Sequence, residues 1–96
     1  MEERRLAEYR NAIAEECDAV KELLIAKNKE YGASAFEPIG VFSSLSAEDQ
    51  IDVRIDDKLK RLQSIRQLDE VRVHEDTEQD LIGYLILKRV ARRFTP

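Results

Sequence analysis

The stretch Leu81-Ile82-Gly83-Tyr84-Leu85-Ile86-Leu87 decides the fold, because it is a run without a single charge inside a segment rich in charged residues. In a helix such a run is apolar on every side, which favours burial on more than one side. The spacing around it predicts a helix from about Glu75 to Phe94, central in a bundle or packed against another subunit. The run is far too short to span a membrane.

Two further helices are predicted upstream. Between Glu2 and Lys29 apolar residues recur every three or four positions without Gly or Pro, which indicates one long helix. We expect it to end at Tyr31-Gly32, because glycine readily adopts the left-handed conformation that closes helices. Ser46 has the form of a helix N-cap, followed by acidic residues and renewed helical spacing. A second helix is therefore predicted to reach about Gln67.

The connections between these helices differ in character. Gly32 to Leu45 combines turn residues with large apolar ones, which predicts an ordered loop packed on the core, with a short extra turn between Phe36 and Phe42. Leu68 to His74 is interpreted as a connector, too short and isolated for a sheet. The prediction is one all-α domain over residues 1–96, a bundle of three main helices completed by oligomerisation.

Composition narrows the possible functions. A chain of 96 residues buries a limited core, which favours a homo-oligomer such as a dimer or tetramer. The net charge of −4 argues against general nucleic-acid binding, and no membrane segment or targeting signal is evident. A single cysteine, Cys17, cannot form an internal disulfide, which favours the cytoplasm. Its place on the apolar face of the first helix predicts a buried small side chain.

Four charged residues share one stripe of the second predicted helix: Arg54, Asp57, Lys58 and Arg61. Their spacing of three and four residues places them side by side. The ordinary interpretation is a solvated face on which Asp57 pairs with Arg61. The alternative is a phosphate-binding stripe, because guanidinium and ammonium groups bind phosphate oxygens.

On the third predicted helix, Asp76 and Asp80 lie one turn apart, and such a pair can share a Mg²⁺ ion. Asp76 also has an explanation without a metal ion, because the helix dipole stabilises a carboxylate in the first turn. Asp80 directly precedes the apolar run, where a charge is costly unless it is paired or binds a ligand. Gly83 is expected to allow close approach of another helix, and Tyr84 either stacks on a base or belongs to the core.

Three blocks of sequence resemble a known family when taken together: Lys27-Asn28-Lys29-Glu30-Tyr31-Gly32, Arg54-Ile55-Asp56-Asp57-Lys58-Leu59-Lys60-Arg61-Leu62, and Glu75-Asp76-Thr77-Glu78-Gln79-Asp80-Leu81-Ile82-Gly83-Tyr84. Their order and spacing resemble the nucleotide modification associated domain 1 family of phages and bacteria. That family is similar in outline to the MazG-like all-α nucleoside triphosphate pyrophosphohydrolases. Those enzymes are helical oligomers that bind Mg²⁺ through carboxylates of two helices and cleave between the α- and β-phosphates.

The resemblance implies a role for each matched residue. Mg²⁺ would be held by Asp76 and Asp80 with Asp57 opposite, and these three carboxylates would form the catalytic set. Phosphates would be bound by four basic residues: Arg54, Lys58, Arg61 and Lys27. Base or sugar would be contacted by Asn28, Tyr31 and Tyr84. The chain departs from the MazG-like pattern, because one or two of the four expected metal carboxylates are missing.

The resulting prediction is a Mg²⁺-dependent nucleoside triphosphate pyrophosphohydrolase of bacterial or phage nucleotide metabolism, working in the cytoplasm. Because the carboxylate set is incomplete, a protein that binds or sequesters a nucleotide without cutting it is the first alternative. A purely structural helical oligomer or partner-binding module is the second, motivated by the apolar run on the third helix.

Overall fold

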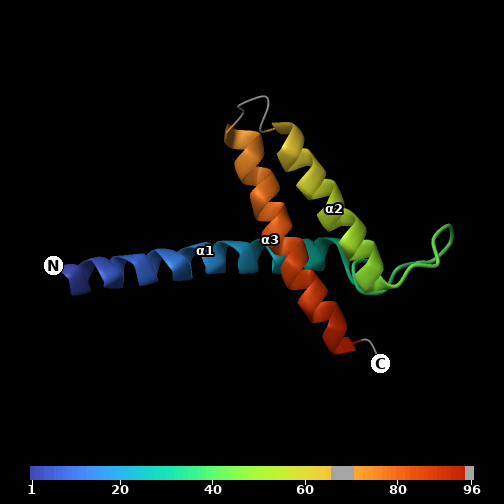
Figure 1. Cartoon of the computed structure of the whole chain (residues 1–96). Coiled ribbons are helices and arrows are strands. Elements are labelled where there is room, and N and C mark those ends of the chain that lie inside the picture. Colours follow the sequence, from blue (N-terminus) through green and yellow to red (C-terminus); the bar gives the residue numbers. More distant parts are fainter. Residues whose placement is uncertain (66–70, 95–96) are drawn as a thin grey trace. The chain divides into compact units, whose positions relative to one another are not determined.

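The structure, a computed structural model, describes residues 1–65 and 71–94, with side chains of the last helix described from residue 76 onward. Within these ranges the chain forms three helices and no strand (Figure 1). They are α1 (Glu2–Tyr31), α2 (Ala47–Ile65) and α3 (Val71–Phe94). The all-α prediction is confirmed. The chain divides into two compact units, Met1–Gly32 and Ala33–Pro96, and each is described by itself.

The first unit is the single helix α1, with the extent that its sequence predicts. Acidic residues in its first turn and Lys29 in its last complement the helix dipole. The helix ends at Gly32, whose φ of 65° is left-handed and whose N–H donates to the Asn28 carbonyl at 2.7 Å. Glycine is favoured here because other residues pay a steric cost for that conformation.

The apolar stripe of α1 is largely exposed, including Leu6, Tyr9 and Ile13. Cys17 is exposed as well, so the prediction that its side chain is buried is wrong. Periodicity shows which residues share one face of a helix. It does not show that another element covers that face.

In the second unit, α2 begins where the sequence predicts. The Ser46 hydroxyl accepts a hydrogen bond from the Asp49 backbone N–H at 3.1 Å, as an N-cap should. The described part of α2 ends at Ile65, and the predicted extension to residue 67 lies outside the described residues. The helix α3 begins at Val71, not at Glu75, so the connector prediction is wrong for residues 71–74. Two alternating valines without a neighbouring strand gain more backbone hydrogen bonds by extending the helix.

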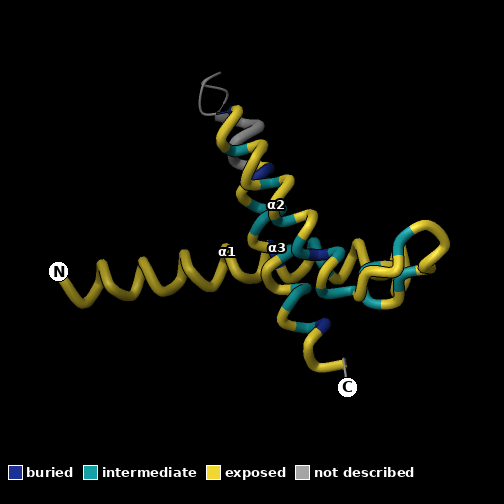
Figure 2. Tube along the Cα trace, turned by 45° about the vertical axis from the view of Figure 1, so that its right-hand side comes forward, coloured by how far each residue is buried: buried dark blue, intermediate teal, exposed yellow. Residues whose placement is uncertain are grey.

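The helices α2 and α3 run antiparallel and pack against each other (Figure 1). The buried residues of this pair are mostly small or branched (Figure 2), namely Ile51, Ile65, Thr77, Gly83 and Ala91. Burial of Gly83 agrees with the expected role in close helix packing. Within one chain the run from Leu81 to Leu87 is buried on one side, because Ile82, Leu85 and Ile86 are exposed.

The loop before α2 does not pack as predicted. Its turn is closed by the Phe36 and Glu37 N–H groups, which both donate to the Ala33 carbonyl, and so begins ahead of the expected segment. Ile39 and Phe42 are almost completely exposed, which contradicts the expectation that this loop covers the core. Within the Ala33–Pro96 unit the core is the contact between α2 and α3, and the exposed Ile39 and Phe42 lie outside it. No helix in the described part of the chain is long and apolar enough to cross a membrane.

Candidate phosphate-binding site on the α2–α3 pair

Two of the predicted site residues meet across the two helices. Lys58 of α2 forms an ion pair with Asp80 of α3, with Nζ 3.2 Å from Oδ2. The two side chains are only 20% and 33% exposed, so the pair is partly shielded from water. The sequence indicated that a charge at Asp80 is costly unless it is paired or binds a ligand, and this contact supplies the partner. Its charge is tolerated beside the apolar run because an ammonium group neutralises it.

The other basic residues of the stripe flank Lys58 along α2. Arg54 lies four residues before it and Arg61 three residues after it, which places one arginine about a helical turn to each side. Both arginines are exposed, as is Asp57. The stripe therefore combines two accessible guanidinium groups with a central ammonium that is held in place by a carboxylate.

The predicted residues of α3 form a matching row. Asp76 and Tyr84 lie one turn to either side of Asp80 and so share its face of the helix. Asp76 is exposed and Tyr84 is half-buried. Among the side chains that the structure describes, no three His, Cys, Asp or Glu residues lie close enough to hold a metal ion together. The three aspartates predicted to bind Mg²⁺ therefore do not form one donor group in this arrangement.

The remaining predicted residues lie in the Met1–Gly32 unit. Lys27, Asn28 and Tyr31 are exposed near the end of α1. The Asn28 side chain has a structural task that the sequence interpretation did not assign to it. Its Nδ2 donates to the Gly32 carbonyl at 3.0 Å and so stabilises the end of the helix.

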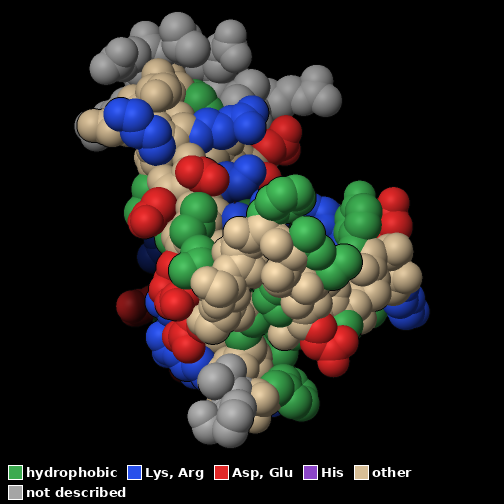
Figure 3. Space-filling view, turned by 90° about the vertical axis from the view of Figure 1, so that its right-hand side faces the viewer, with side chains coloured by type: hydrophobic (Ala, Val, Ile, Leu, Met, Phe, Trp, Pro, Cys, Tyr) green, Lys and Arg blue, Asp and Glu red, His purple; other side chains and the backbone are tan. Residues whose placement is uncertain are grey.

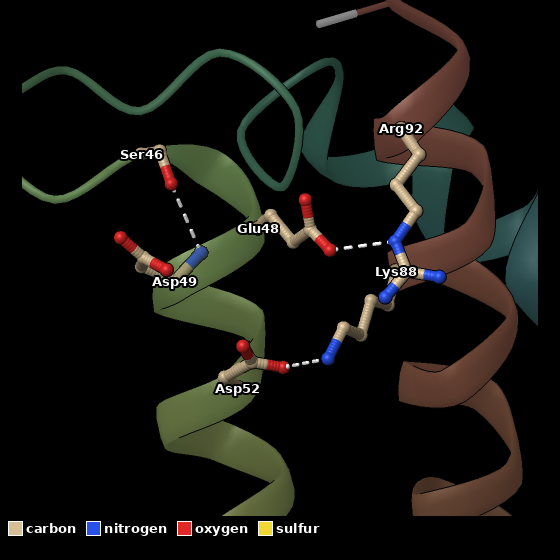
Figure 4. A network of polar contacts seen from close by, with 6 residues as sticks. All are labelled: Ser46, Glu48, Asp49, Asp52, Lys88 and Arg92. Atoms are coloured by element: carbon tan, nitrogen blue, oxygen red, sulfur yellow. Dashed lines mark hydrogen bonds and ion pairs between the residues drawn. The ribbon is translucent and has the colours of Figure 1, made fainter.

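Two ion pairs between α2 and α3 were not predicted (Figure 4). The Nε atom of Arg92 lies 2.6 Å from Oε1 of Glu48, and Nζ of Lys88 lies 2.6 Å from Oδ1 of Asp52. The sequence contains a pattern that could have predicted these two ion pairs, because α2 begins with acidic residues and α3 ends with basic ones. With the Lys58–Asp80 pair these contacts form a row of three, which we call the cross-helix ion pairs.

Charged side chains of both signs are interspersed along α2, among them Arg54, Asp57 and Lys58. Figure 3 shows Lys and Arg side chains beside Asp and Glu side chains, with hydrophobic groups emerging between them. Such a surface offers discrete cationic points and not a continuous basic field.

Comparison of the chain with family models, with curated proteins and with solved structures finds no match.

Proposed function

We propose that the protein is a nucleotide-binding helical domain whose α2 stripe binds the phosphates of its ligand. The observation that carries this proposal is the arrangement around Lys58. Lys58, whose side chain is 20% exposed, pairs with Asp80 and lies on the stripe between two exposed residues, Arg54 and Arg61. The resemblance of the three sequence blocks to a family of nucleotide-handling proteins supports the same proposal.

The chemistry of the stripe suits a phosphate chain. Guanidinium groups present paired N–H donors that match two phosphate oxygens, and they keep their charge at any physiological pH. An ammonium carries three N–H donors, so Lys58 can keep its contact with Asp80 and still donate to a phosphate. Pre-positioning of Lys58 reduces the side-chain entropy that binding would otherwise cost.

The proposed binding does not depend on a magnesium ion. Asp80 is paired with Lys58, and the described side chains include no group of three donors. We therefore derive no hydrolytic step through a metal ion. Hydrolysis of a nucleoside triphosphate with Mg²⁺ stays a prediction from the resemblance, as does a role in the cytoplasm of a bacterium or of a phage-infected host.

Self-association belongs to the same proposal. Ile82, Leu85 and Ile86 leave an exposed apolar strip on α3, and a dimer or tetramer would remove it from water. Sedimentation of the purified chain measures its oligomeric state directly, and a monomer at working concentrations would argue against self-association.

Ligand binding tests the proposed function. We expect nucleoside triphosphates to bind in EDTA as well as in Mg²⁺, and Lys58→Gln to weaken binding about tenfold, because it removes a charge-assisted contact. Lys60→Gln is the matched control, since Lys60 is an exposed residue of the same helix that lies off the stripe. It should change affinity less than about twofold.

The same experiment separates the alternatives. Calorimetry gives the affinity, chromatography shows whether the ligand is recovered intact, and circular dichroism confirms that each variant remains helical. Equal affinities of Lys58→Gln and Lys60→Gln would contradict the proposal. Release of pyrophosphate only in Mg²⁺ would support the hydrolase predicted from the resemblance.

A further inference from the structure

The outer face of α3 carries charges of opposite sign at its two ends. We give this name to four residues that share one side of the helix: Glu78, Ile82, Leu85 and Arg89. Ile82 is 48% exposed and Leu85 is 47% exposed, and both charged residues are exposed as well. The face thus presents two large apolar side chains between an acidic end and a basic end.

This face is not the side of α3 that contacts α2. Asp80 and Lys88 form ion pairs with α2, and they lie about two turns apart on another side of the helix. A partner can therefore occupy the outer face without displacing α2.

The spacing of the outer face is the same when it is read from either end. Glu78 precedes Ile82 by four positions, and Arg89 follows Leu85 by four. When two copies of the helix pack in opposite directions, each Ile82 can therefore lie opposite the partner's Leu85. In the same register each Glu78 lies opposite the partner's Arg89, which gives two symmetry-related ion pairs. Packing in the same direction would place like charges opposite each other at both ends, where they repel.

We infer that the outer face of α3 binds the same face of a second copy, in an antiparallel dimer with two-fold symmetry. The inference rests on the self-association proposed above and adds to it the surface, the direction and the register. Burial of Ile82 and Leu85 stabilises the dimer, and the charges at the two ends select its direction. Glu78 also has an interaction within its own chain, and a carboxylate can accept a further donor.

Charge reversal tests the register. Arg89→Glu places a carboxylate opposite the partner's Glu78, and we expect it to raise the dissociation constant of the dimer about tenfold. Glu78→Arg should have a similar effect. The variant with both substitutions exchanges the charges and restores both ion pairs, so its dissociation constant should return to within about threefold of the wild-type value. Lys60→Glu is the matched control, because it changes the net charge as much as Arg89→Glu at an exposed position of α2.

Sedimentation over a range of concentrations gives each dissociation constant, and circular dichroism confirms that each variant remains helical. Equal dissociation constants of Arg89→Glu and Lys60→Glu would overturn the inference, and so would a doubly substituted variant that does not regain the dimer. In either case the self-association itself would stand. A wild-type protein that stays monomeric would overturn both.

The apolar contact is tested separately. Leu85→Gln should raise the dissociation constant about tenfold, because each dimer loses two buried leucines. Leu59→Gln is the control, since Leu59 is 51% exposed and lies on α2. It should change the dissociation constant less than about twofold. Equal effects of the two substitutions would contradict the inference.

A measurement on the wild-type protein needs no variant to fold. In a sample that mixes two isotope-labelled forms of the chain, NOE signals between copies should connect the methyl groups of Ile82 with those of the partner's Leu85. A dimer that lacks these signals would overturn the inference alone.

Discussion

The helix α1 and the α2–α3 pair are built from the same kinds of residue, yet different interactions hold them. Both carry apolar positions at helical spacing with charged residues between them. Ile51 of α2 is 3% exposed, whereas Ile13 of α1 is 62% exposed. The ion pair between Arg4 and Glu8 lies within α1, while the three cross-helix ion pairs join α2 to α3. A helical pattern thus specifies a helix, and a complementary partner specifies its packing.

Truncation of an isoleucine in each region should give the largest contrast. We expect Ile51→Ala to lower the free energy of unfolding by about 2–5 kcal/mol, because it removes buried methyl groups and leaves a cavity. Ile13→Ala should change it by less than about 0.5 kcal/mol, as for other surface positions. Urea unfolding followed by circular dichroism measures both. A large loss in Ile13→Ala would show that the stripe of α1 is covered in solution.

Removal of a helix cap should have an intermediate effect. Ser46→Ala deletes the hydroxyl that accepts from the Asp49 N–H and should cost about 1 kcal/mol. Ser44→Ala, at an exposed position of the same loop, is the control and should cost much less. Thermal unfolding of the two variants compares them. Equal melting temperatures would show that the Ser46 hydroxyl does not stabilise α2.

The ion pairs should give the smallest differences. A double-mutant cycle on Glu48 and Arg92 should yield a coupling of at most about 1 kcal/mol, and the same cycle on Arg4 and Glu8 less than about 0.5 kcal/mol. The first pair is closer, at 2.6 Å against 3.8 Å, and its carboxylate is less exposed. Both couplings should fall in high salt. A larger coupling within α1 would reverse the comparison.

Local chemistry explains what could be predicted from the sequence. The C-terminal end of α1 follows from the conformational preference of Gly32, and the start of α2 from the hydrogen-bonding preference of Ser46, and both act over a few residues. The exposed loop around Phe42 and the exposed Cys17 could not be foreseen in this way. Their burial depends on whether another element covers them, and no property of the residue itself decides that.

The same distinction between local pattern and packing applies to the candidate site. Helical spacing is enough to place Lys58 on one stripe with the two arginines once α2 is a helix, and the cost of an isolated charge suggested a partner for Asp80. Spacing within one helix could not identify that partner, because it depends on the register between α2 and α3. The acidic residues at the start of α2 and the basic residues at the end of α3 indicate this register. They could have been used to predict which residues of the two helices pair.

The cross-helix ion pairs also imply an order of events during folding. Along the chain, the paired residues are separated by 80 − 58 = 22, 88 − 52 = 36 and 92 − 48 = 44 positions. The entropy lost on closing a loop grows with its length, by about 0.6 kcal/mol for each doubling. Lys58 and Asp80 therefore meet at the lowest cost, and each later pair closes only a short additional loop. The contact at the centre of the proposed binding site is thus expected to be the first to join the two helices.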